Sequence, residues 1–131
     1  MKRTYLKKYS TRQIPTLKKK LWSVFTKWIK ARDKNICFTC GKKVEGYSSQ
    51  GGHFIPKSVC GTSLYFHPDN VHCQCSFCNL QLEGNRLEYA KRLGQEKVNE
   101  LYLIKNMVIE KWTAQDYLHK IEMYTNLLKN L

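Results

Sequence analysis

Apolar side chains recur every three or four residues in several parts of this 131-residue chain. Between Pro15 and Arg32 this spacing predicts an amphipathic helix with lysines on its opposite face. Further helices are expected from Ser76 to about Arg92, from Gln95 to about Ile109, and from Thr113 to about Lys129. Gly94 separates the first two of these helices, and Thr113 with Asp116 has the spacing of an N-terminal capping box. In the helix after Gly94 the residues expected to pack inward are Val98, Leu101, Tyr102 and Met107.

Residues 35–72 have no helical period and contain five of the seven glycines and two of the three prolines. This composition predicts short strands and loops. One hairpin is expected with Gly46–Gly52 as its turn and the strand around His53–Ile55 as its second arm, and residues 62–66 are expected to be extended. The pattern therefore predicts an α+β fold in one domain over residues 15–131, with C-terminal helices over 95–131.

Positive charge is concentrated near the N-terminus. Residues 1–34 hold twelve Lys and Arg against one acid, Asp33, and so carry a net +11 of the total +13. Such a segment favours a nucleic-acid partner, because neutralising phosphates releases counterions. A basic tail that only aids solubility, or a segment that binds an acidic membrane surface, is an alternative. Residues 1–14 are predicted to be a flexible basic arm.

Six cysteines give the chain candidate chemistry. Cys37 and Cys40 form one CxxC pair, and Cys75 and Cys78 form another. Four thiolates in two such pairs are typical of a structural zinc site. The alternative is a set of reduced, buried thiols. Disulfides would need a secretory context, and the polar N-terminus with no apolar run near ~20 residues indicates a soluble, cytoplasmic protein instead. Cys60 and Cys73 are predicted to lie outside the zinc site.

The insert between the two pairs carries His53 and Asn70, and Asn79 follows Cys78 directly. A zinc ion that fixes both ends of the insert would bring the His53 strand against the start of the helix that carries Asn79.

This arrangement resembles an HNH endonuclease of the ββα-metal type, with Asn in the third position of the motif. More narrowly, the chain is similar to the NinG/Rap family of phage recombination nucleases. The segments that carry the resemblance are LKKKLWSVFTKWIKARD (17–33), CFTCG (37–41), GGHFIPKS (51–58), YFHPDNVHCQCSFCN (65–79) and GNRLEYAKRLG (84–94).

The resemblance implies a fold and a set of roles. The fold is a zinc-stabilised ββα-metal core over 37–92, with an N-terminal amphipathic helix and C-terminal helices. His53 would be the general base that activates water, and Asn79 would bind a catalytic Mg²⁺ or Mn²⁺. Asn70 would shape the loop and help to orient His53. Many HNH nucleases place an acid just before the histidine, whereas this chain has Gly52 there.

Other polar residues are candidates for supporting roles. Further metal ligands could come from His67, Asp69, His72 and Glu83, of which Glu83 is expected on the same helical face as Asn79. Phosphate contacts are expected from Lys18, Lys19, Lys20, Lys57 and Arg86.

The function implied by the resemblance is metal-dependent hydrolysis of phosphodiester bonds in branched recombination DNA, such as Holliday junctions or D-loops, by a protein that could act as a homodimer. Two alternatives stay open. One is a zinc-dependent DNA-binding module without catalysis, and the other is a less selective HNH nuclease that nicks duplex DNA.

Overall fold

A computed structural model describes residues 11–107 and 111–131. Two compact units divide the chain. The helical unit combines Met1–Trp28 with Lys111–Leu131, and the sheet unit is Ile29–Glu110. Most of the predicted basic arm lies outside the described residues. Its last part is helical, since Thr11–Gln13 form the 3-10 helix η1 and Ile14 begins α2.

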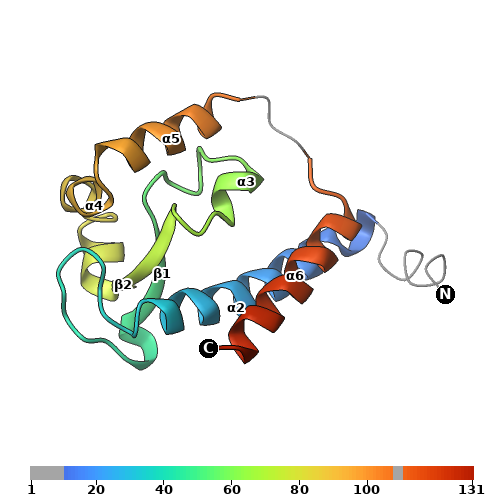
Figure 1. The fold of residues 1–131 in the computed structure, drawn as a ribbon, viewed down its shortest axis with the longest axis horizontal. Coiled ribbons are helices and arrows are strands. Elements are labelled where there is room, and N and C mark those ends of the chain that lie inside the picture. The colour runs from blue at the N-terminus through green and yellow to red at the C-terminus, as the bar shows by residue number, and fades with distance from the viewer. Residues whose placement is uncertain (1–10, 108–110) are drawn as a thin grey trace. The chain divides into compact units, whose positions relative to one another are not determined.

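In the helical unit, helix α2 (Ile14–Arg32) packs along its length up to Trp28 beside helix α6 (Ala114–Lys129) (Figure 1). Leu17, Leu21 and Phe25 recur every four residues on α2 and are fully buried, as their spacing predicts. The ring of Phe25 lies 4.9 Å from that of Tyr124 on α6, in an edge-to-face arrangement. The first turn of α6 contains the predicted capping box.

The sheet unit is built on two antiparallel strands, β1 (Ser49–His53) and β2 (Val71–Cys75) (Figure 1). Their register pairs Ser49 with Cys75 and His53 with Val71. The expected hairpin within residues 42–56 is therefore wrong, because the partner of β1 follows it by about twenty residues. Gly51 and Gly52 lie within β1 and not in a turn.

The connection between the strands contains helix α3 (Thr62–Tyr65), where an extended segment was expected. Tyr65 N–H donates to the Gly61 carbonyl at 2.9 Å, and the Asn70 side chain donates to the Leu64 carbonyl at 3.0 Å. A side chain six residues further along the same connection thus satisfies a carbonyl of this turn and opposes the strand preference of residues 62–66.

The segment after β2 forms two helices instead of one. The π-helix η3 (Phe77–Gln81) ends at a turn, and α4 (Arg86–Leu93) follows. Glu83, Gly84 and Asn85 all have positive φ in that turn, which no helix can accommodate. Helix α5 (Gln95–Lys105) follows Gly94, which also has positive φ, and Val108–Glu110 at the expected end of α5 lie outside the described residues. Leu101 is buried as predicted, but Tyr102 and Met107 are exposed.

An ion pair at the start of the sheet unit fixes β2. The Arg32 guanidinium contacts the Asp33 carboxylate at 2.7 Å and donates to the Pro68 and Val71 carbonyls. Asp33 accepts in turn from Cys73 N–H at 2.8 Å. Arg32, although counted in the basic segment, is thus engaged within the protein. None of the helices among the described residues is long and apolar enough to cross a membrane.

Candidate functional site

The side chains of Cys37, Cys40, Cys75 and Cys78 come together in the sheet unit. Their four sulfur atoms all lie within 4.8 Å of one another, and the Cys40 and Cys75 sulfurs are 3.8 Å apart. Tetrahedral Zn–S bonds of about 2.3 Å place sulfurs about 3.8 Å apart, so the separations of these four sulfurs fit a zinc ion. Cys40 is exposed and the other three are buried. The four cysteines form a cluster that could hold a structural metal such as zinc.

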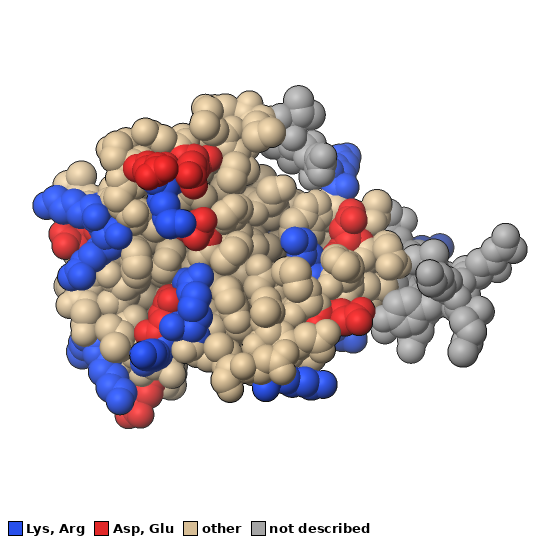
Figure 2. Space-filling view, in the orientation of Figure 1, with Lys and Arg blue, Asp and Glu red and all other residues tan. Residues whose placement is uncertain are grey.

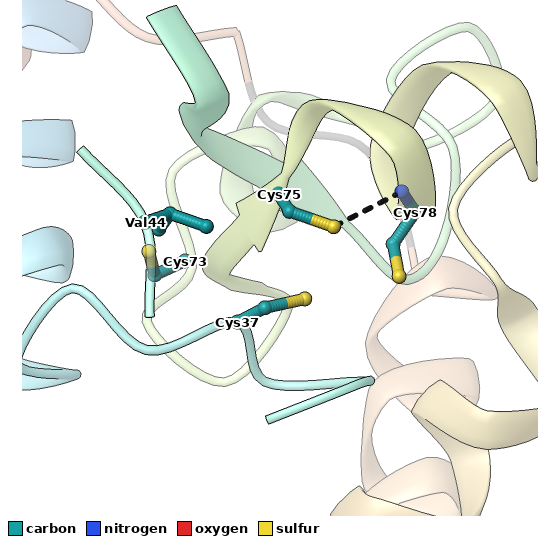
Figure 3. Packing of buried hydrophobic residues seen from close by; sticks show 5 residues of the cluster. All are labelled: Cys37, Val44, Cys73, Cys75 and Cys78. Atoms are coloured by element: carbon teal, nitrogen blue, oxygen red, sulfur yellow. Dashed lines mark hydrogen bonds between the residues drawn. The ribbon is translucent and has the colours of Figure 1, made fainter. Parts of the chain in front are cut away.

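Hydrogen-bond donors surround these sulfurs. Cys78 N–H donates to the Cys75 sulfur at 3.3 Å (Figure 3), and the Asn85 amide donates to the Cys78 sulfur at 3.6 Å. Burial raises the pKa of Cys40. At Cys37 burial acts in the same direction, but the Thr39 hydroxyl and several backbone hydrogen bonds outweigh it and lower the pKa. Four adjacent thiolates repel one another, and a divalent cation offsets that repulsion.

Cys73 does not share this arrangement. Its sulfur points away from those of Cys37, Cys75 and Cys78, toward Val44 (Figure 3), and lies 3.7 Å from the Ser49 hydroxyl. Within residues 11–107 and 111–131 the four cysteines are the only group of three or more His, Cys, Asp or Glu arranged to hold a metal. Cys60 and Cys73 lie outside it, as predicted.

His53 ends strand β1 and is half-buried. Its Nε2 lies 3.0 Å from the Tyr65 carbonyl oxygen. A carbonyl oxygen can only accept, so Nε2 carries the proton and the lone pair of the neutral ring is on Nδ1. Helix α3 therefore sets both the orientation and the tautomer of this imidazole.

Asn70 is fully buried directly before β2. Its Oδ1 accepts from Ile55 N–H at 2.8 Å, and its Nδ2 donates to the Ile55 and Leu64 carbonyls at 3.2 and 3.0 Å. Asn70 thus closes the loop that follows His53.

Asn79 lies on η3, where a chain of three polar groups fixes its amide. The Tyr47 carbonyl accepts from Gln50 Nε2 at 3.2 Å, which turns Gln50 Oε1 toward Asn79. Asn79 Nδ2 donates to that oxygen at 2.9 Å. Asn79 Oδ1 is therefore directed away from Gln50. A carboxamide oxygen presented in this way is suited to a hard cation such as Mg²⁺.

The histidines proposed as additional ligands have internal partners. His72 is buried, stacks on Phe38 at 3.8 Å and lies 3.1 Å from the Tyr89 hydroxyl. Burial, followed by the positive charge of Arg32, lowers the pKa of His72 to about 4, so this ring is neutral near pH 7. His67 Nδ1 accepts from Asp69 N–H at 3.0 Å within the turn before Asn70.

The charged residues proposed as metal ligands or phosphate contacts do not form one cluster. Asp69 pairs with Lys97 at 3.3 Å. Glu83 is exposed in the left-handed turn after η3, so it does not continue the helical face of Asn79 as expected. Arg86 is exposed, yet its guanidinium donates to the Phe54 carbonyl and so serves the fold beside His53.

The lysines expected to contact phosphate are exposed. Lys57 follows the His53 loop, whereas Lys18, Lys19 and Lys20 belong to the helical unit. On the face shown in Figure 2, basic side chains form several groups with acidic side chains between them.

Two polar neighbours of the candidate residues were not predicted from the sequence. Gln50 orients Asn79, and Gln74 is a fully buried side chain on β2. They are direct cross-strand partners, so their side chains share one face of the sheet. Sequence alone could identify them only from the alternation of side chains between the two faces of a strand. That alternation can be used only when the strand pairing is known.

The fold and the site define a mixed helical and antiparallel-sheet protein built around a four-cysteine cluster that can hold a metal. Among known families, the one described as "Bacteriophage Lambda NinG protein" matches residues 2–131. This chain belongs to the NinG family.

Curated relatives agree with that assignment. The chain is 30% identical over 109 residues to Protein ninG of Escherichia phage lambda, and equally to Protein ninG of Escherichia phage 933W. Each alignment covers 79% of this chain and 52% of the relative. The chain thus spans about half the length of the curated relatives that it matches. No solved structure matches it.

Proposed function

We propose that this protein is a metal-dependent DNA endonuclease of the HNH type. The observation that carries the proposal is the orientation of two side chains. The Tyr65 carbonyl leaves His53 with its lone pair on Nδ1, and the bond to Gln50 turns Asn79 Oδ1 away from Gln50. These are the two atoms that a general base and a metal ligand must present.

The chemistry follows from these atoms. A neutral imidazole with a lone pair on Nδ1 can take a proton from water near pH 7, and its Nε2–H bond to Tyr65 stabilises the imidazolium that results. Mg²⁺ or Mn²⁺, when bound, neutralises charge on the scissile phosphate and on the departing oxygen. Asn79 Oδ1 would hold this ion together with water and phosphate oxygens. The cysteine cluster would hold zinc in a structural role, since four thiolates leave no open position for water.

The family resemblance and the net charge both support DNA as the substrate. The family resemblance suggests branched recombination DNA, and the net charge of +13 suits a polyanion in the cytoplasm of a host cell. A homodimer would be suited to paired cuts across a junction.

A second candidate is a zinc-dependent DNA-binding module without catalysis. The observation that favours it is the lack, in the described part of the chain, of any cluster of metal-binding His, Cys, Asp or Glu besides the four cysteines. It does not account for the fixed orientations of His53 and Asn79.

The test is cleavage of a labelled four-way junction and a matched duplex, with Mg²⁺, Mn²⁺ or EDTA. Parental protein is compared with His53→Ala and with a control, His119→Ala, whose exposed imidazole lies on α6. We expect metal-dependent cutting that only His53→Ala abolishes. Preference for the junction supports a branch-selective enzyme, and equal cutting of both substrates supports the duplex-nicking alternative. Tight binding of DNA without cleavage in the presence of either metal would refute the nuclease proposal and favour the DNA-binding module.

A further inference from the structure

The carboxamide of Gln74 occupies the space beside Gly52. A Cβ atom built on Gly52 would lie 1.7 Å from Gln74 Oε1 and 2.6 Å from Gln74 Cδ. The φ of Gly52 is not in the left-handed region, so space and not backbone conformation is what requires glycine here. Position 52 is where many HNH nucleases carry an acidic ligand, and in this chain Gln74 excludes every side chain from it.

Gln74 has little freedom to move aside. It is fully buried, and its Nε2 donates to the Thr39 hydroxyl at 3.1 Å and to the Gly84 carbonyl at 2.9 Å. Because the carbonyl can only accept, these bonds fix which end of the amide faces Gly52. Among the described residues, Gln74 Oε1 is the only buried side-chain oxygen or nitrogen without a hydrogen-bond partner. It lies 1.7 Å from where a Cβ of Gly52 would be, so one Cα hydrogen of Gly52 points toward it and can offer only a weak C–H···O contact.

The partners of Gln74 belong to three parts of the candidate site. Thr39 lies in the first cysteine pair, and its hydroxyl is 3.4 Å from the Cys37 sulfur. Since the Thr39 oxygen accepts from Gln74, its own proton is available to Cys37. Gly84 lies in the turn that follows η3, the helix of Asn79. Gly52 directly precedes His53.

We propose that Gln74 is a positioning residue for the nuclease site. It holds the His53 end of β1, the turn after the Asn79 helix and the first cysteine pair in one arrangement, and in doing so it occupies the place of the missing acid. This inference rests on the proposed nuclease function. It implies that the metal site at Asn79 works without a carboxylate from position 52.

Two variants of Gln74 separate its bonds from its volume. Gln74→Met keeps the length of the side chain and removes both N–H donors, whereas Gln74→Ala opens the space beside Gly52. A matched control is Gln95→Met, since Gln95 is exposed on α5. For Gln74→Met we expect kcat on the labelled junction to fall at least about tenfold with KM and zinc content unchanged, because small displacements of catalytic groups are costly. The ¹⁵N shifts of the His53 ring should also move. Parental kcat and ring shifts in Gln74→Met would overturn the positioning role.

A double-mutant cycle of Gly52→Ala and Gln74→Ala, with the melting temperature as its readout, tests whether Gln74 excludes side chains from position 52. Gly52→Ala alone should lower it by roughly 10 °C or more, and in the Gln74→Ala background by no more than about 3 °C. Equal effects in both backgrounds would overturn the steric part of the inference. This cycle needs no cleavage activity. A parent that cuts no DNA would therefore refute the proposed function, while the cycle and the His53 shifts still decide the role of Gln74 in the fold.

Discussion

Replacing Asn70 with alanine tests how the loop after His53 is held. The change removes three buried hydrogen bonds, one from Ile55 N–H and two to the Ile55 and Leu64 carbonyls. Each bond contributes about 1 kcal/mol net, and a buried N–H left without a partner adds a penalty of about 1–3 kcal/mol. We therefore expect a loss of about 4–6 kcal/mol in the free energy of unfolding. For a domain of this size that corresponds to roughly 16–24 °C in melting temperature.

The assay is thermal and urea denaturation at a fixed zinc concentration, followed by circular dichroism. The control is Asn99→Ala, which removes an exposed amide from α5 and should change the melting temperature by about 2 °C or less. If Asn70→Ala melts within about 2 °C of the parent yet cuts no DNA, the reasoning is refuted. Asn70 would then act on the substrate and not on the loop.

Three further predictions concern the metals and the pH dependence. Changing Cys75 and Cys78 together to Ser should release the one zinc ion expected per chain and unfold the sheet unit; retention of zinc, measured with a colorimetric chelator, would contradict the cysteine site. Gln50→Leu should raise the Mn²⁺ concentration for half-maximal cleavage about tenfold, whereas Gln50→Glu, which keeps an acceptor for Asn79, should not. Because the pKa of His72 is lowered to about 4 from 6.5, the unfolded chain binds more protons between these values. Stability should therefore be constant above about pH 6.5 and fall by up to about 3 kcal/mol toward pH 4, a slope that His72→Gln should reduce.

The helices that pack by an apolar stripe could be predicted from the sequence. Leu17, Leu21 and Phe25 mark the buried face of α2, and the Thr113 cap marks the start of α6. The cysteine cluster could also be predicted from the sequence. Two CxxC pairs are typical of one shared metal site, whatever the structure of the segment between them.

The sheet was harder to predict because its decisive contacts are long-range. Gly51 and Gly52 are typical of a turn, but here both lie in β1, and the buried Gln74 occupies the space of a Gly52 side chain. Residues 62–66 have strand-forming side chains, yet Asn70 stabilises a helical turn there. In both places a buried carboxamide packs against the segment. Gln74 lies on the partner strand of Gly52, whereas Asn70 lies only six residues after Leu64. No periodicity in the sequence signals either contact.

The same type of side chain supports most of the candidate site. Gln50, Asn70, Gln74 and Asn79 are all neutral amides, and each has one end fixed by a backbone carbonyl or by another amide. Asn70 and Gln74 are fully buried, whereas Gln50 and Asn79 are half-buried. An amide can be held by hydrogen bonds in such places without the desolvation cost of a charge. The consequence for the proposed chemistry is a metal site with a single neutral protein ligand. Such a site attracts Mg²⁺ weakly by itself, and the phosphate of the bound DNA supplies most of the negative charge. Metal binding and DNA binding should therefore depend on each other, which restricts hydrolysis to the complex.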